Sequence, residues 1–216
     1  MNIIGHRGCP DHFPENTIAA VRGSAPHVDM VEIDVQRCGS GEVVVFHDDS
    51  LDRLTGSTGR VAETPLSELS SLRINGSEER IPTFDAVVNA LPAGTGLNVE
   101  LKQAGMAEDV LPLLTDFDEE IIISSFEPEA LAEITADEIP TALLFGSDFE
   151  ESLDTAVGLS CECVHPHYDI LDEQRVEMAH NRGMAVNTWT VPTADTVARL
   201  REMGVDGVIV DSWTIV

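Results

Sequence analysis

Four short motifs place acidic, basic and imidazole side chains at the ends of apolar, strand-like segments. They are His6-Arg7-Gly8, Glu32-x-Asp34, His47-Asp48 and Glu100-x-Lys102. Side chains two residues apart on a strand point to the same face, so Glu32 lies beside Asp34. A buried charge is costly unless it is paired, hydrogen-bonded or bound to a metal ion. Three carboxylates, two imidazoles and two cationic groups at strand ends therefore indicate a functional site and not a core.

The residue types also predict the chemistry of that site. The three carboxylates offer hard oxygen ligands, which suit Mg²⁺ or Ca²⁺ better than zinc. Arg7 and Lys102 beside such a cation would bind an anion such as phosphate. His6 and His47 can exchange protons near neutral pH, one as base and one as acid, in an order that the sequence does not decide. Together these groups indicate cleavage of a phosphodiester by in-line displacement.

Several of these residues also have a purely structural interpretation. Glu100 and Lys102 could form an ion pair that only stabilises the barrel, and Arg7 could simply neutralise an acidic cluster. His165 and His167 flank Pro166 at a strand end, so one of them could reach the pocket, although a structural or surface position is favoured.

Apolar segments with strand character recur along the chain, and helical patterns separate most of them. Nearly continuous apolar strands that alternate with helices are typical of a parallel sheet covered by helices. About eight such units in 216 residues predict a compact, somewhat irregular (β/α)8 TIM barrel of the α/β class. The expected strands are residues 2–5, 30–36, 43–47, 97–102, 120–126, 141–145, 161–165, 185–191 and 205–211.

Local signals predict where several helices begin. Pro128 is expected in the first turn of a helix, where its missing N–H does no harm. Thr83 and Thr193 are expected as N-caps, and either Asn16 or Thr17 caps the first helix. The segment around Asn16 could also order the loop beneath the site.

Two segments break the alternation of strands and helices. Residues 37–42 are too few for a helical crossover, and their glycines predict a hairpin turn. With nine candidate strands, either one of them lies outside the barrel or the barrel is irregular. Residues 49–80 are rich in Ser, Thr and Gly with weak periodicity, and we interpret them as a small insertion after the third strand, over the site end. The whole chain, residues 1–216, is then one catalytic domain.

The net charge of −27 limits the choice of partners. A field of this sign repels nucleic acid and anionic membrane surfaces, so we expect neither as a partner and no stable membrane association. Lys102 is the single lysine among 12 basic residues. Acid-rich, lysine-poor surfaces resemble those of proteins from a high-salt cytoplasm, where salt screens the repulsion.

No apolar segment is long enough to cross a bilayer, and strand-like residues begin at position 2 without the features of a signal peptide. We therefore expect a cytoplasmic protein. The cysteines at 9, 38, 161 and 163 lack zinc-finger or thioredoxin spacing; Cys161 and Cys163 are expected on one face of a strand. The oligomeric state is not predicted by the sequence.

The order of the motifs resembles the signature of the glycerophosphodiester phosphodiesterase family over essentially the whole chain. One departure lies at the end, where the family often has Thr-Asp-x-Pro and this chain has Val210-Asp211-Ser212-Trp213. Besides the four motifs above, the matching segments include Pro14-Glu15-Asn16-Thr17, Leu51-Asp52-Arg53-Leu54-Thr55, Ile81-Pro82-Thr83-Phe84, Asn187-Thr188-Trp189-Thr190 and Gly204-Val-Asp206-Gly207.

The resemblance implies a phospholipase-C-like TIM barrel that hydrolyses small glycerophosphodiesters to sn-glycerol 3-phosphate and an alcohol. It implies that the glycerol 2-hydroxyl attacks phosphorus and that water then opens a cyclic phosphate. The implied roles are cation binding (one Mg²⁺ or Ca²⁺) by Glu32, Asp34 and Glu100, acid–base catalysis by His6 and His47, phosphate binding by Arg7 and Lys102, and lining of the glycerol or leaving-group side by Trp189. Trp189 could instead be a packed core residue.

Two alternatives remain at this point. The same barrel could act on a lysophospholipid or another diester, which would need an apolar approach to a membrane or micelle. The polar insertion and the negative charge favour soluble substrates. The second alternative is a non-catalytic barrel that binds phosphate or metal; the presence of both histidines argues against it.

Overall fold

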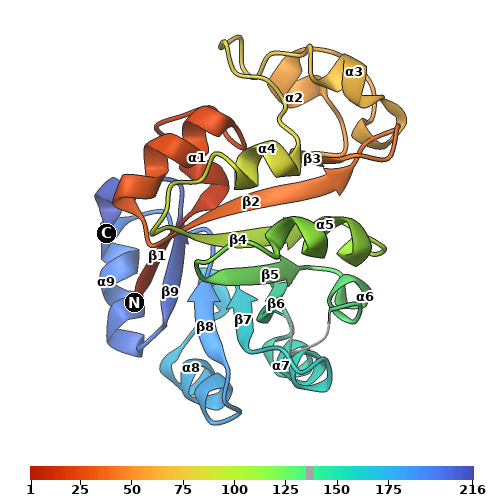
Figure 1. Cartoon of the computed structure of the whole chain (residues 1–216). Helices are drawn as coiled ribbons and strands as arrows, with labels where there is room; N and C mark the ends of the chain where they lie inside the picture. Colours follow the sequence, from red (N-terminus) through yellow and green to blue (C-terminus); the bar gives the residue numbers. More distant parts are fainter. Residues whose placement is uncertain (135–138) are drawn as a thin grey trace.

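The computed structural model describes residues 1–134 and 139–216, and their strands close into a parallel barrel (Figure 1). β1 pairs with β2 on one side and with β9 on the other, which closes the ring. The predicted (β/α)8 TIM barrel is confirmed. Its strands, in order around the ring, are β1 (Asn2–Gly5), β2 (Met30–Arg37), β4 (Gly96–Leu101), β5 (Ile121–Ser125), β6 (Thr141–Phe145), β7 (Cys163–Pro166), β8 (Ala185–Thr188) and β9 (Gly207–Val210).

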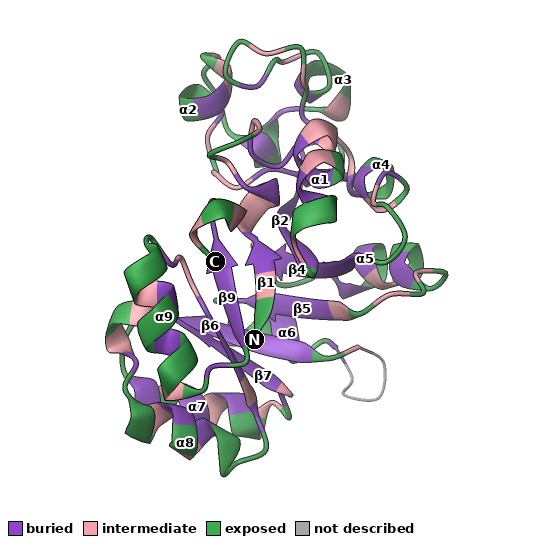
Figure 2. Ribbon diagram, turned by 90° about the vertical axis from the view of Figure 1, so that its left-hand side faces the viewer, coloured by how far each residue is buried: buried purple, intermediate pink, exposed green. Residues whose placement is uncertain are grey.

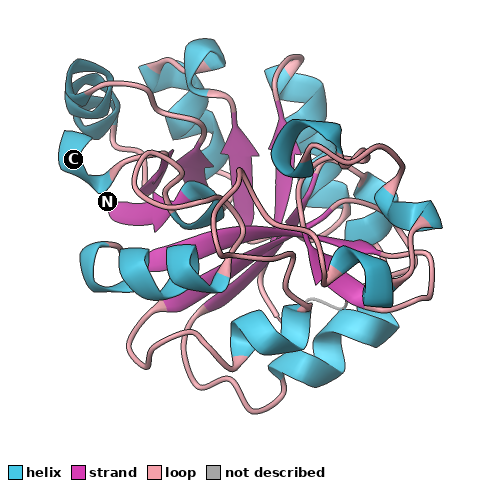
Figure 3. Ribbon diagram, turned by 90° about the horizontal axis from the view of Figure 1, so that it is seen from above, coloured by secondary structure: helices cyan, strands magenta, loops and turns pink. Residues whose placement is uncertain are grey.

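Helices between the strands surround this ring, as the view from above shows (Figure 3). They are α1 (Ile18–Ser24), α4 (Phe84–Val88), α5 (Ala107–Leu114), α6 (Pro128–Leu131), α7 (Phe149–Gly158), α8 (Glu173–His180) and α9 (Ala194–Met203). The hydroxyls of Thr17, Thr83 and Thr193 each accept an N–H of the first helical turn. Thr17, and not Asn16, is therefore the cap of α1.

The barrel is apolar on both sides of its wall, which explains the continuous apolar strands. The strands are buried along nearly their whole length, whereas the helices are buried only on the side that faces them (Figure 2). Alternate strand residues pack either outward against the helices or inward against each other. The inward apolar cluster consists of Ile4, Met30, Ile122, Ala142, Cys163 and Ile209. Polar side chains follow this cluster toward the carboxyl ends of the strands.

β3 (Val43–Val45) lies outside the ring and pairs antiparallel with β2, which confirms the predicted hairpin and explains the ninth candidate strand. Residues 46–81, here called the small lobe, follow β3 and extend beyond the carboxyl end of β2 (Figure 1). They contain α2 (Asp52–Thr55) and α3 (Leu66–Leu69). A second hydrophobic cluster, separate from the barrel core, joins the lobe to the β2–β3 hairpin; it consists of Cys38, Val44, Phe46, Leu51, Leu54, Val61, Leu69, Ile74 and Ile81.

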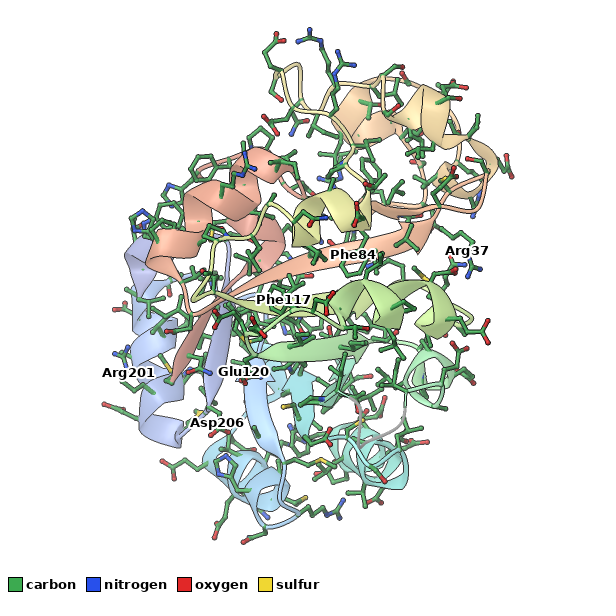
Figure 4. All side chains as sticks on the ribbon, in the orientation of Figure 1. Arg37, Phe84, Phe117, Glu120, Arg201 and Asp206 are labelled. Atoms are coloured by element: carbon green, nitrogen blue, oxygen red, sulfur yellow. The ribbon has the colours of Figure 1, made fainter. Side chains whose placement is uncertain are left out.

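Packing on the outside of the wall ties helices to strands. Phe84 of α4 is fully buried against β2, and Arg37, at the outer end of β2, donates to Asp109 of α5 (Figure 4). The four cysteines are free and buried. Cys163 faces the barrel interior and Cys161 the helix side, so the expectation of a shared face was wrong, because β7 begins only at Cys163. Among the described residues, no helix combines the length and apolar character that a membrane crossing requires.

Candidate active site

Glu32, Asp34 and Glu100 converge at the carboxyl end of two neighbouring strands. Asp34 of β2 is paired in register with Glu100 of β4, and Glu32 lies two residues before Asp34 on the same inward face. All three side chains are buried, and one carboxylate oxygen from each lies within 4.8 Å of the other two. The predicted convergence of these acids is therefore present in the fold.

The neighbouring cationic side chains do not fully compensate the negative charge of these three carboxylates. Burial and repulsion from Asp34 and Glu100 hold the pKa of Glu32 well above its ordinary value, and burial with repulsion from Asp34 raises the pKa of Glu100. Burial acts in the same direction on Asp34, but Lys102 and Arg7 hold the pKa of that carboxyl below its ordinary value. Buried like charges of this kind are stable only with added positive charge nearby.

An unpaired acceptor points to the charge that the trio lacks. Glu32 Oε2 accepts the backbone N–H of Arg7 at 2.7 Å, but Glu32 Oε1 has no hydrogen-bond partner among the described residues. A buried carboxylate oxygen without a donor is rare in a native protein unless an ion or water serves it. The donors of the trio are all oxygens, so the residues fit a hard divalent cation such as Mg²⁺ or Ca²⁺.

The backbone at the end of β1 is shaped to reach this trio. Arg7, Gly8 and Cys9 have φ values of 50°, 75° and 65°, three successive residues in the left-handed region. A Cβ at Gly8 would lie 2.6 Å from Ala20 Cβ, so only glycine fits against α1. This strained turn directs the Arg7 N–H at Glu32, and strain of this kind is typical of functional sites.

His6 and His47 both line the cavity beside the trio and are held in the same manner. His6 Nδ1 donates to Asp211 Oδ1 at 2.6 Å, and His47 Nδ1 donates to Asp48 Oδ1 at 2.7 Å. Nε2 of each ring makes no hydrogen bond to the part of the chain that the structure describes, and so could contact a substrate. Burial, with smaller contributions from Arg7 and Lys102, lowers the pKa of His47 although Asp34 and Asp48 oppose the shift.

One cavity of about 150 Å³ joins these groups. Its polar wall comes from the β1, β2 and β4 side, and its apolar wall from the β5, β6, β8 and β9 side. The lining residues are His6, Arg7, Glu32, His47, Asn98, Glu100, Phe126, Leu144, Trp189, Thr190 and Ile209. A larger cavity of about 650 Å³ lies around the end of α5 and the start of β5; its lining is chiefly Leu, Ile, Phe and Pro, and Glu119 is the one ionisable group that the described residues contribute to it.

Arg7 and Lys102 lie against the carboxylates and not free in the cavity. Arg7 donates through Nη1 to Glu15 at 2.8 Å, and its Nε lies 3.3 Å from Asp34 Oδ2. Lys102 Nζ donates to Glu100 Oε1 at 2.6 Å and to Asp34 Oδ1 at 3.3 Å. The cavity wall includes Arg7 but not Lys102. Lys102 therefore has the ion-pair geometry of the structural alternative, at the edge of the site.

Trp189 both packs and lines the cavity. Its Nε1 donates to the carbonyl of His165 at 2.6 Å, and its ring meets Phe126 edge-on with centroids 5.3 Å apart. His165 itself is sealed inside the barrel beside Asn187, and burial lowers the pKa of its imidazole to about 3. His165 therefore does not reach the cavity.

Four residues around the site were not identified from their types. Asp211 orients His6, and Asn16 donates to Asp34 Oδ2 at 2.8 Å from a left-handed backbone. Glu15 and Arg53 form ion pairs behind Arg7 and Asp48. Asp211 stands at the end of β9, so the same strand-end argument that identified His6 would have found it. Arg53 lies in the small lobe, and no local signal places it near the barrel.

Comparisons with known proteins agree with this architecture. A family model described as "Glycerophosphoryl diester phosphodiesterase family" matches residues 6–214. A glycerophosphodiester phosphodiesterase of Caldanaerobacter subterraneus is 32% identical, over 97% of this chain and 93% of the relative.

Solved structures superpose over nearly the full chain. An Oleispira antarctica phosphodiesterase, in complex with the product sn-glycerol-3-phosphate, gives a TM-score of 0.92 at 29% identity, covering 100% of this chain and 95% of that chain. A glycerophosphodiester phosphodiesterase of Thermotoga maritima gives 0.86 at 26% identity, covering 99% and 95%. The barrel and the small lobe therefore both have counterparts in these structures.

Proposed function

This chain belongs to the glycerophosphoryl diester phosphodiesterase family, and we propose that it hydrolyses soluble glycerophosphodiesters to sn-glycerol 3-phosphate and an alcohol. The observation that carries the proposal is the convergence of three buried carboxylates within 4.8 Å beside a cavity that two histidines also line. The product bound in the Oleispira antarctica relative supports the choice of substrate. Residues 1–216 act as one catalytic domain, in which the segment at about 49–80 is an insertion.

Glu32, Asp34 and Glu100 hold one divalent cation, Mg²⁺ or Ca²⁺. The unpaired Glu32 Oε1 and the raised pKa values of Glu32 and Glu100 support this ligand set. Such a cation, when bound, neutralises the trio and stabilises the negative charge of a phosphoryl group in the transition state.

The two walls of the cavity suit the two halves of a glycerophosphate. Arg7 supplies positive charge in the polar wall, where the phosphate lies, and Lys102, outside that wall and paired with Glu100, adds to the positive field there. Trp189 lines the side that receives the carbon chain of glycerol. The volume of about 150 Å³ matches a small polar head. This size favours soluble diesters over lysophospholipids.

The hydrogen bonds of the histidines favour His47 as the base and His6 as the acid. Burial lowers the pKa of His47, so its imidazole is neutral at pH 7 and can accept a proton at Nε2. The charge of Asp48 beside it is shared with Arg53. Asp211, in contrast, forms no side-chain ion pair other than the one to His6 among the described residues, and its bond to Nδ1 orients the ring so that Nε2 faces the substrate.

The reaction then proceeds in two balanced steps. His47 removes the proton of the glycerol 2-hydroxyl as that oxygen attacks phosphorus, and His6 protonates the departing alcohol. The product of this step is a cyclic glycerophosphate. In the second step the histidines exchange roles: His6 removes a proton from water, which opens the ring, and His47 returns its proton to the 2-hydroxyl.

The test is an assay of glycerophosphocholine, glycerophosphoethanolamine and lysophosphatidylcholine with Mg²⁺, with Ca²⁺ and with chelator, at high salt. Release of sn-glycerol 3-phosphate from the first two substrates, lost with chelator, supports the proposal. Faster turnover of lysophosphatidylcholine would favour the lysophospholipid alternative. Cation binding without turnover of any diester would favour a non-catalytic barrel. A salt-rich cytoplasm is the setting that we propose, supported by the acidic, lysine-poor composition.

A further inference from the structure

Arg53 forms hydrogen bonds with two carboxylates from different segments of the chain, Asp48 and Glu15. Its Nε and Nη2 donate to the two oxygens of Asp48 at 2.6 and 2.9 Å. Its Nη1 and Nη2 donate to the two oxygens of Glu15 at 2.8 and 2.9 Å. Asp48 in turn accepts from His47 Nδ1, and Glu15 accepts from Arg7 Nη1. An unbroken series of charge-assisted hydrogen bonds thus runs from Arg7 to His47.

The planar guanidinium of Arg53 is suited to this position. A fork of fixed geometry binds two carboxylates at once and sets the angle between them, which a point charge cannot do. Glu15 is nearly buried, with 9% of its side chain exposed, so its charge depends on Arg53 and Arg7 for compensation. The hydrogen bonds from Arg53 also lower the pKa of Asp48 to about 2.

The small lobe determines where Arg53 lies. Arg53 is in α2, the first helix of the lobe, between Leu51 and Leu54, which are both buried in the second hydrophobic cluster. The carbonyl of Leu54 also accepts the N–H of Asn75 at 2.6 Å, which ties α2 to the far side of the lobe. The packing of the lobe thereby fixes the position of the Arg53 side chain, which reaches both Glu15 and Asp48.

We propose that Arg53 is a positioning residue for the phosphodiesterase reaction, which orients His47 through Asp48 and Arg7 through Glu15. The proposal rests on the proposed function, because His47 and Arg7 are assigned roles only there. It gives the small lobe a function: the lobe is the support that fixes Arg53. Since Arg53 acts on a catalytic base and on a phosphate-binding group together, its loss affects both kcat and KM.

The experiment compares Arg53→Gln and Arg53→Lys with the wild-type protein, using glycerophosphocholine as substrate. Loss of an outer hydrogen-bonding partner costs on the order of 10–100-fold in activity. We expect a kcat loss in that range and a raised KM for Arg53→Gln, and an intermediate loss for Arg53→Lys, which keeps the charge but not the fork. Arg60→Gln is the matched control, because Arg60 belongs to the same lobe, is 59% exposed and pairs only loosely with Asp49 at 3.5 Å.

A double-mutant cycle separates positioning from simple attachment of the lobe. If Arg53 acts on His47 through Asp48, Arg53→Gln in an Asp48→Asn background causes little further loss of kcat. In a Glu15→Gln background it causes little further change in KM. If Arg53 only attaches the lobe to the barrel, its loss would instead reduce the amount of folded enzyme and leave kcat per folded molecule and KM unchanged. Thermal unfolding and titration of bound cation measure the folded fraction.

The outcomes are distinct. Values of kcat and KM within about two-fold of wild type for Arg53→Gln, or equal losses in the wild-type and Asp48→Asn backgrounds, would overturn the inference. If Arg53→Gln does not fold, the same criteria apply to Arg53→Lys. If the wild-type protein cleaves no glycerophosphodiester, the proposed function fails and this inference with it. An active wild type with an equally active Arg53→Gln variant refutes only the role of Arg53.

Discussion

Replacing Glu32 by Gln should leave the thermal stability of the cation-free protein unchanged or higher, but should reduce the stabilisation that a bound cation gives. Glu32 is 3% exposed, carries an unpaired oxygen and lies beside two other acids. The amide keeps an acceptor for the Arg7 N–H and turns the unpaired oxygen into a donor that Asp34 and Glu100 can accept. We therefore expect cation-free Glu32→Gln to be as stable as the cation-free wild type, or more so.

The size of the expected Tm change follows from the free energy with which a bound cation stabilises the folded state. A ligand at 100 times its Kd stabilises the folded state by about 2.7 kcal/mol. For a chain of about 150–250 residues, each kcal/mol raises Tm by roughly 2–4 °C, so the wild-type Tm should rise by about 5–11 °C. If loss of one carboxylate weakens binding by about 100-fold, the same cation concentration equals the Kd of the variant and stabilises it by only about 0.4 kcal/mol, or roughly 1–2 °C.

The assay is thermal unfolding in chelator and in a titration of Mg²⁺ or Ca²⁺. Glu162→Gln is the matched control, because Glu162 also accepts one backbone N–H, from Thr141 at 2.9 Å, but lies outside the acidic trio. The control should show the full wild-type response to the cation. A cation-free Tm of Glu32→Gln more than about 4 °C below wild type, or an undiminished cation response, would refute the reasoning; 4 °C is roughly 1–2 kcal/mol at this size.

Three further predictions concern side chains in and around the barrel mouth, and a fourth concerns the net charge. His6→Ala should retain much more activity on a diester with an acidic nitrophenol leaving group than on glycerophosphocholine, whereas His47→Ala should lose both, as release of each alcohol would show; equal losses on both substrates for His6→Ala would exclude His6 as the acid. Burial holds the pKa of His165 at about 3, below the unfolded value of about 6.5, so the unfolded chain binds the extra proton and stability falls by up to about 1.4 kcal/mol per pH unit from pH 6.5 toward 3. Urea unfolding at a series of pH values measures this dependence. For His165→Gln, the change in the free energy of unfolding per pH unit should be smaller by this amount. An unchanged pH dependence would mean that His165 is not buried in its neutral form. Lys102→Arg should impair turnover markedly, because a planar fork cannot replace a point charge between Glu100 and Asp34; steady-state kinetics near those of wild type would make Lys102 peripheral. Thermal unfolding in molar KCl should give a higher Tm than in dilute buffer, because salt screens a net charge of −27; an equal Tm would count against salt adaptation.

The fold could be anticipated because its signals are local. Each barrel strand is buried on both faces and therefore consists of a short apolar run, and helix caps such as Thr83 and Thr193 act within one turn. The meeting of Glu32, Asp34 and Glu100 could also be anticipated, because the carboxyl ends of parallel strands share one end of a barrel.

What could not be anticipated depends on contacts between distant segments. Arg53 reaches Glu15 only because the small lobe packs beside the first loop, and no periodicity in residues 49–80 encodes that packing. Asn16 was expected as a cap or as part of an ordered loop, yet its side chain holds Asp34. The opposite faces of Cys161 and Cys163 depend on where β7 starts, and strand boundaries are poorly determined by local composition.

The proposed cation site can be tested by diffraction from crystals soaked in Mn²⁺ or Ca²⁺ together with sn-glycerol 3-phosphate. We expect one anomalous peak, from an ion coordinated by an oxygen of each of Glu32, Asp34 and Glu100, at about 2.3–2.6 Å if the ion is Ca²⁺. We also expect the phosphate of the product at that ion, between His6 and His47. A cation bound elsewhere, or a product whose phosphate lies away from both imidazoles, would contradict the proposed site.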